Sequence, residues 1–257
     1  MPERTIVDHV AAVAIIINAG SPSQIFAEIK DDGLPIKAFR RTICPIGGNW
    51  IGQAARNDYG PRGTLCRELT EELSLEKTTA STLELRLLGD IPEGNFYQTP
   101  SLDVKPTEAA TQGLEELKRA IAQGCMPFGD FIITIPRAVF DRADPQNKRD
   151  GMKYIVSYWA IALDETRWKN LVLLQEMFGN LSNESITVIT SLEEIVSAKM
   201  RCAYGHDGPL RQFFLAMGLP LADNLPMIDG ISGEFIGPSL ASYAEYLKRY
   251  EVLRKPV

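Results

Sequence analysis

Residues 10–17, VAAVAIII, are the segment that most limits how this chain can fold. All eight residues are apolar, several are β-branched, and the run stops at the turn-forming sequence Asn-Ala-Gly-Ser-Pro of residues 18–22. The segment is too short to cross a bilayer as a helix, and no convincing signal-peptide cleavage site follows it. It therefore predicts a buried β-strand near the start of the chain.

Similar patterns predict further elements along the chain. Alternating or β-branched runs indicate strands at residues 24–30, 38–44, 83–89, 130–135, 154–163 and 186–189. Periodic apolar residues indicate helices at residues 64–75, 108–123, 209–217 and 239–255, and Ser191 with Glu194 is typical of a helix start. Residues 46–63 and 218–237 have the composition of loops. We expect the first strands to form a small, mostly antiparallel sheet that resumes after the second helix.

Composition limits the classes of partner. The chain has 257 residues, of which 45% are hydrophobic and 23% charged, so it can bury a full globular core. A formal charge of −6 argues against general nucleic-acid binding, although a small anionic ligand remains possible if a metal or a local basic pocket supplies positive charge. The four cysteines are scattered, which favours a reducing compartment. We expect a cytoplasmic protein without a membrane segment.

The segment from residue 64 to residue 75 contains the residues with the clearest chemical meaning. A helix turns about 100° per residue, so the side chains of this segment separate into two faces. One face carries Leu65, Cys66, Leu69 and Leu73, and the opposite face carries Glu68, Glu71 and Glu72. Three carboxylates this close repel one another, and a hard divalent cation such as Mg²⁺, with Mn²⁺ as an alternative, would relieve that repulsion. A solvated acidic surface is the other interpretation of this face.

The loop before this helix favours the metal-site interpretation. Residues 44–50 read Cys-Pro-Ile-Gly-Gly-Asn-Trp, and the paired glycines Gly47 and Gly48 allow the backbone to approach a ligand closely. Arg67 is suited to hold a carboxylate by a bidentate hydrogen bond. Gly47, Gly48 and either Arg40 or Arg41 are therefore candidates for substrate binding, since consecutive strand residues point to opposite sides.

This combination resembles the Nudix hydrolase family. Its motif runs Gly, five residues, Glu, seven residues, then Arg-Glu-hydrophobic-x-Glu-Glu-x-Gly-hydrophobic. Residues matching the second half are Arg67, Glu68, Leu69, Glu71, Glu72 and Leu75, while Ser74 replaces the final glycine. Gly48 lies 19 positions before Arg67 instead of 14, so the loop half carries an insertion. Tyr59 occupies the position of the loop glutamate, and its neighbour Asp58 is a possible substitute.

The resemblance implies an α/β fold, an α/β/α sandwich with a mixed sheet, over residues 8–217. A helical insertion at about residues 100–128 and a C-terminal helical extension at residues 218–257 would be added to it, the extension packing on the domain or forming a homodimer contact. It also implies that Glu68, Glu71 and Glu72 bind the metal, that one of them acts as general base, and that Arg67 anchors a carboxylate.

The expected function is Mg²⁺-dependent hydrolysis of a diphosphate linkage in a nucleotide-like small molecule, such as a nucleotide sugar or a dinucleotide. A Nudix-fold nucleotide-binding or regulatory module with weak or no catalysis is the alternative, and the altered loop supports it. A third possibility, an isomerase on the same fold, lacks an identifiable protonating pair.

Several other residues are secondary candidates. Glu184, Glu193 and Glu194 are candidates for an additional acid, although helix capping explains Glu194 better. For His206, with Asp207 as a helix N-cap, and for His9 we expect structural roles. Trp50, Phe96 and Tyr97 either stack on a base or fill the core.

Overall fold

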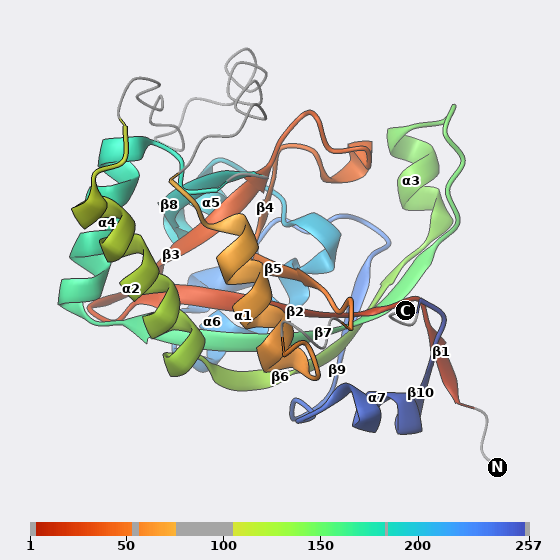
Figure 1. The fold of residues 1–257 in the computed structure, drawn as a ribbon. Coiled ribbons are helices and arrows are strands. Elements are labelled where there is room, and N and C mark those ends of the chain that lie inside the picture. The colour runs from red at the N-terminus through yellow and green to blue at the C-terminus, as the bar shows by residue number, and fades with distance from the viewer. Residues whose placement is uncertain (1–3, 53–56, 76–104, 183–184, 255–257) are drawn as a thin grey trace.

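The chain folds into an α/β sandwich in which helices cover both faces of a mixed, open β-sheet (Figure 1). The computed structural model describes residues 4–52, 57–75, 105–182 and 185–254. The expected strand at residues 83–89, the first residues of the insertion, and Phe96, Tyr97 and Glu184 lie outside these ranges.

Strand β2 (Val10–Asn18) lies inside the sheet, as its apolar sequence predicts. It pairs in parallel with β7 (Met152–Leu163) along its whole length, and antiparallel with β3 (Ser21–Lys30) and β5 (Ile46–Asn49) on its other edge. Its side chains alternate between two cores, so Ala12, Ala14 and Ile16 enter one and Val13, Ile15 and Ile17 enter the other. A strand buried on both faces needs an apolar residue at nearly every position.

The main sheet runs in the order β4-β3-β2-β7-β6-β9, while β5 pairs with β2 and β8 pairs with β3. The strands not yet given are β4 (Thr42–Cys44), β6 (Met126–Ile135), β8 (Ile186–Ser191) and β9 (Ser232–Gly237). Strands β2 and β3 pair with each other only near their turn; beyond it, β4 pairs with the end of β3 and β5 pairs with the start of β2. The chain passes from β4 to β5 through Pro45.

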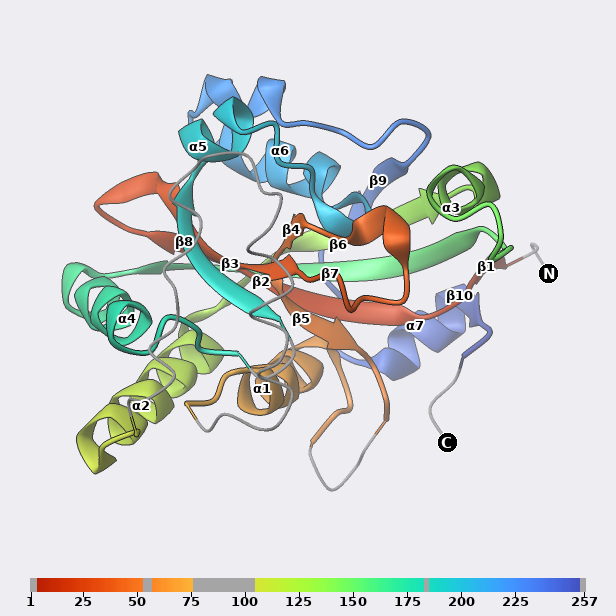
Figure 2. The ribbon, with the colours of Figure 1, turned by 90° about the horizontal axis from the view of Figure 1, so that it is seen from above.

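Two helical layers enclose the sheet, as the view from above shows (Figure 2). The first layer consists of α1 (Pro61–Glu72), α2 (Glu108–Gly124) and α4 (Glu165–Phe178). The second consists of α3 (Arg137–Ala143), α5 (Leu192–Ser197) and α6 (Asp207–Ala216), with 3₁₀ turns at Lys37–Phe39, Ala203–Gly205 and Pro220–Asn224. Leu65, Leu69 and Leu73 fix α1 to the first core, as their four-residue spacing predicts.

A third, smaller core joins the two ends of the described chain. Strand β1 (Thr5–Val7) pairs in parallel with β10 (Tyr250–Val252), which directly follows α7 (Tyr243–Arg249). Tyr243 and Tyr246 of α7 are fully buried in this core. The expected helix at residues 239–255 is therefore wrong in extent, because pairing with β1 replaces helical hydrogen bonds after Arg249.

Other sequence expectations are confirmed or corrected. Helix α2 matches the expected helix at residues 108–123, and Ser191 and Glu194 form a capping box at the start of α5. Helix α1 begins at Pro61 instead of Thr64, because proline suits the first helical position, and it ends at Glu72. The strand expected at residues 38–44 is confined to β4, since the residues before it form a 3₁₀ turn and Arg41 has a positive φ of 55°.

Two segments expected to be loops contain strands. Strand β5 lies within residues 46–63 and forms backbone hydrogen bonds with β2. Strand β9 lies within residues 218–237 and forms backbone hydrogen bonds with β6. Helix α4 follows β7 where no element was expected, with Asp164 capping it by accepting from the Arg167 amide. Within the described ranges, every helix is too short or too polar to traverse a lipid bilayer.

Candidate active site

The acidic face of α1 is turned inward. Glu68 and Glu72 are 9% and 4% exposed, whereas Glu71 is half-buried. An acidic helix face that only interacted with solvent would be exposed, so this burial argues against the solvated-surface interpretation. The carboxylates lie between α1 and the strands beneath it, where uncompensated charge is costly.

Arg67 connects these carboxylates to the preceding loop. Its Nη1 donates to Glu71 Oε2 at 2.6 Å, and its Nη2 donates to Glu68 Oε1 and to the Asn49 carbonyl oxygen, both at 2.6 Å. Its Nε lies 3.4 Å from Asp58 Oδ2. The guanidinium therefore joins the end of β5, the following loop and α1, which agrees with the expected anchoring role.

Asp58 is the loop carboxylate beside Arg67. It is 1% exposed, its Oδ2 accepts from the Ile51 and Gly52 amides at 3.0 and 3.2 Å, and its Oδ1 accepts from the Thr64 hydroxyl. The side chain of Tyr59, which stands at the position of the loop glutamate when residues are counted back from Arg67, is 62% exposed. Of these two candidates for the loop acid, Asp58 is therefore the buried side chain beside Arg67, whereas Tyr59 is directed to solvent.

Gly48 lets the Glu68 carboxylate reach the backbone of β5. A Cβ atom at position 48 would lie 2.4 Å from Glu68 Oε1. Gly47 has a positive φ of 146°, and a Cβ there would lie 2.2 Å from the Ala12 carbonyl oxygen. Both glycines are therefore needed for packing, Gly48 against the acidic face of α1 and Gly47 against β2.

A buried ion pair on β3 lies near the same helix. Lys30 Nζ donates to Glu28 Oε2 at 2.8 Å, and Glu28 is fully buried. Burial alone would lower the pKa of Lys30, but the negative charges of Glu28 and Glu72 favour its protonated form, and the pKa is raised well above its ordinary value. Lys30 therefore stays protonated close to Glu72.

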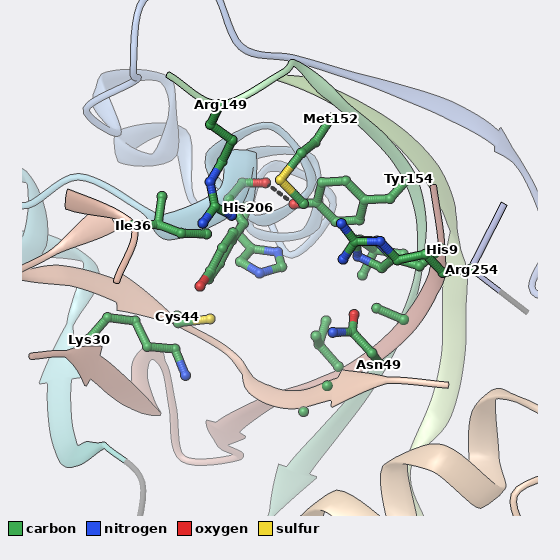
Figure 3. A pocket seen from close by; sticks show the side chains of 16 residues that line it. His9, Lys30, Ile36, Cys44, Asn49, Arg149, Met152, Tyr154, His206 and Arg254 are labelled. Atoms are coloured by element: carbon green, nitrogen blue, oxygen red, sulfur yellow. Dashed lines mark hydrogen bonds between the residues drawn. The ribbon is translucent and has the colours of Figure 1, made fainter. Parts of the chain in front are cut away.

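A pocket of about 260 Å³ opens on the second-layer side of the sheet, next to Gly47 and Gly48 (Figure 3). Its polar lining residues are His9, Lys30, Asn49, Arg149, Tyr154, Tyr204, His206 and Arg254. The remaining lining includes Val13, Val156, Ile36 and Met152. Three of the lining side chains are cations, so the pocket offers positive charge in a chain with net negative charge.

The two histidines of the pocket are neutral near pH 7. Burial, reinforced by Lys30, lowers the pKa of His206 to about 3, and its Nδ1 is hydrogen-bonded to the Tyr158 hydroxyl. Burial and then Arg254 lower the pKa of His9 to about 4, and the ring of His9 stacks on Tyr154 at 4.7 Å. These contacts agree with structural roles for both residues.

The structure does not bring the other predicted substrate-binding residues to this pocket. Arg40 Nε donates to the Leu34 carbonyl oxygen at 2.7 Å, and Arg41 forms a bidentate pair with Asp32. Neither lines the pocket, because the 3₁₀ turn and the positive φ of Arg41 turn both away from the strand geometry that the expectation assumed. Trp50 stacks on Tyr243 at 3.9 Å.

Several residues of the pocket and its surroundings were missed from the sequence. Glu28 and Lys30 carried one available signal, since two opposite charges two positions apart share a face of one strand and alternate with apolar residues. Arg149 and Arg254 carried none, because one lies in a loop and the other after β10, and only the folded chain brings them together.

The donor chemistry of α1 fits a hard divalent cation, since Glu68, Glu71 and Glu72 offer carboxylate oxygens from one helix face. In the described part of the chain, no three acidic, histidine or cysteine side chains are gathered in the arrangement of a metal site. The Arg67 guanidinium contacts one oxygen each of Glu68 and Glu71. A cation at this face would therefore share these carboxylates with Arg67 or displace it from one of them.

No protein-family model matches the chain, and no curated protein matches it.

Proposed function

We propose that this chain hydrolyses a diphosphate linkage in a nucleotide-like small molecule with the help of Mg²⁺ or Mn²⁺. The observation that carries the proposal is the position of Gly48, which lines the cationic pocket and contacts the Glu68 carboxylate of α1. The carboxylates of α1, which suit a metal ion, and the cations of the pocket, which suit phosphate, therefore both lie next to strand β5. The resemblance of residues 67–75 to the Nudix motif supports the same chemistry.

The roles of the residues follow from their positions. Glu68, Glu71 and Glu72 would hold the cation, which would supply Lewis-acid polarisation of a phosphoryl oxygen and a more acidic bound water. Asp58 and the Asn49 carbonyl oxygen would keep Arg67 in place beside the carboxylates that hold the cation. Lys30 offsets negative charge on the substrate at the end of the pocket near Glu72.

The test is release of phosphate or mononucleotide from a panel of nucleotide sugars, dinucleotides, nucleoside triphosphates and coenzyme A. Each compound is assayed with Mg²⁺, with Mn²⁺ and with chelator. We expect metal-dependent cleavage of at least one compound, and we expect Glu71→Gln and Glu72→Gln to lower its rate at least about a hundredfold. Thr70→Ala, an exposed change on the same helix, is the matched control. Near-parent rates in both glutamine variants would refute the metal site.

A nucleotide-binding module without hydrolysis is the second candidate. The contacts of Arg67 with both Glu68 and Glu71 favour it, because they satisfy these carboxylates without a cation. Nucleotide binding in the presence of chelator, together with no cleavage across the panel with either metal, would support this module over the hydrolase.

A further inference from the structure

Two arginines, Arg149 and Arg254, line the pocket from segments far apart in the sequence. Arg149 precedes β7 in the connection from α3, and Arg254 follows β10. We name this pair the arginine wall. In Figure 3 the side chains of Arg149, Arg254 and Lys30 approach the pocket from three sides, and Asn49 lies opposite Arg149.

The arginine wall carries positive charge that the neighbouring chain does not neutralise. Lys30 is paired with Glu28, but within the described ranges no carboxylate forms an ion pair with Arg149 or Arg254. None of the described residues that line the pocket is acidic. Arg149 lies over the Phe140 ring at 5.9 Å, a contact that leaves its hydrogen-bond donors available. Two guanidinium groups beside one partly enclosed space favour an anionic ligand.

Backbone pairing fixes the position of Arg254. The Arg254 amide donates to the Asp8 carbonyl oxygen at 2.8 Å, and the Leu253 amide donates to the Val7 carbonyl oxygen at 2.9 Å. Asp8 is itself held by the Lys153 amide, which donates to its carboxylate at 2.7 Å. The backbone hydrogen bonds between the segments of β1 and β10 therefore extend to Arg254 at the edge of the pocket. The backbone position of Arg254 is thus fixed in the absence of a ligand.

We propose that the arginine wall binds a phosphate monoester on the ligand, separate from the diphosphate that meets α1. A phosphate monoester matches the fork of a guanidinium, which donates two parallel hydrogen bonds to phosphate oxygens. The assignment of the diphosphate to the α1 side rests on the proposed function. The binding of the monoester does not, because it needs no metal and no cleavage.

The experiment compares ligands that differ only by one phosphate monoester. Calorimetric titrations with chelator present use NADP⁺ against NAD⁺, and coenzyme A against its 3′-dephospho form. We expect the parent protein to bind the phosphate-bearing member of at least one pair about tenfold or more tightly. Arg149→Gln and Arg254→Gln should each remove most of that preference, because each lowers the affinity for the phosphate-bearing member far more than the affinity for the other member.

Matched controls separate local charge from net charge. Lys148→Gln and Arg249→Gln each remove one positive charge from an exposed side chain close in sequence to Arg149 or Arg254, and both should keep the preference. Equal affinity of the parent for both members of each pair, or no binding of either phosphate-bearing ligand, overturns the proposal. So does loss of the preference in the control variants. Arg254 is exposed, so Arg254→Gln remains informative if Arg149→Gln does not fold.

The two proposals fail in different ways. If the preference is found but no ligand is cleaved with Mg²⁺ or Mn²⁺, the arginine wall stands and the hydrolase proposal falls. If metal-dependent cleavage is found without any preference for the monoester, the hydrolase proposal stands and the arginine wall is refuted.

Discussion

At the scale of single residues, the adjacent glycines of β5 have different tasks. A side chain at position 47 meets the backbone of β2, which cannot move without disturbing the centre of the sheet. A side chain at position 48 meets the end of the Glu68 side chain, which can move. Gly47 is therefore needed for the packing of the sheet, and Gly48 is needed for the position of the Glu68 carboxylate, although the sequence does not distinguish the two glycines.

This difference gives the first prediction. Gly47→Ala should lower the free energy of unfolding by about 2–4 kcal/mol, because it adds a backbone clash to a strained φ. Gly48→Ala should lower it by less than about 1 kcal/mol but displace the Glu68 carboxylate and reduce metal-dependent turnover. Urea unfolding and the hydrolysis assay measure both effects. If Gly48→Ala is the more destabilising change, the proposed division of roles is wrong.

His206 links stability to pH. Its pKa is about 3 in the folded protein and near 6.5 when unfolded, so the unfolded state binds the proton first as pH falls. Its contribution is fully present above about pH 6.5 and is lost progressively toward pH 3. Between pH 6.5 and pH 5 we expect the parent to lose roughly 2 kcal/mol through this residue, and His206→Asn to lose less over the same interval.

Urea midpoints of the parent and His206→Asn at pH 7.5, 6.5, 5.5 and 5 provide the measurement. Other groups whose pKa values change on folding, among them His9 and Asp207, are present in both proteins. His9, with a pKa of about 4, acts in the same direction as His206. Burial raises the pKa of Asp207 to about 6, so Asp207 favours the folded state as pH falls. Parallel pH curves for parent and variant would contradict a neutral, buried His206.

At the scale of elements, the junction between the loop and α1 depends on Asp58. This one carboxylate receives two loop amides and the Thr64 hydroxyl and lies beside Arg67, so it shapes the loop and the first turns of the helix together. The inserted loop therefore has a defined anchor. The position of the following acidic residues on α1 depends on that anchor.

Asp58→Asn should lower the free energy of unfolding by about 2–4 kcal/mol, because it leaves the buried Arg67 charge with less compensation. Tyr59→Phe is the matched change at the position that the motif spacing selects, and at an exposed side chain it should cost less than about 0.5 kcal/mol. Thermal and urea unfolding compare the two. Equal effects would mean that Asp58 does not anchor Arg67.

Elements with a strong local pattern were predictable, and elements held by distant partners were not. The apolar run of β2 and the leucine spacing of α1 identified both elements, and the acidic face of α1 identified the candidate site. Strand β9, with the sequence SGEFIG, has exposed side chains and forms because β6 supplies its hydrogen bonds. The pocket was not predictable for the same reason, since Arg149 and Arg254 come from separate segments.

At the scale of the whole molecule, the C-terminal segment supports the candidate site from outside the main sheet. Tyr243 stacks on Trp50, and its hydroxyl is 2.6 Å from Thr64 Oγ1, which in turn donates to Asp58. The Tyr243 amide donates to the Tyr59 carbonyl oxygen at 2.9 Å. Residues far apart in the sequence therefore share one hydrogen-bond network, which ends at the ion pair of Asp58 with Arg67.

A double-mutant cycle tests this network. Tyr243→Phe and Thr64→Val should each cost about 1 kcal/mol, and the double variant should cost less than their sum because both remove the same hydrogen bond. Tyr250→Phe, a partly buried tyrosine outside this network, should show additive effects with Thr64→Val. Free energies from urea unfolding give the coupling. Additivity of Tyr243→Phe with Thr64→Val would place Tyr243 outside the network.

The parallel pairing of β1 with β10 also sets an order of events during synthesis. The first strand of the described chain leaves the ribosome long before residues 250–254, and it has no partner in this small sheet until they follow. The rest of the pocket lining, up to His206, is translated earlier, whereas Arg254 arrives with the strand that holds it. A nascent chain that stalls before residue 254 therefore has an open-sided pocket, with half of its arginine wall missing.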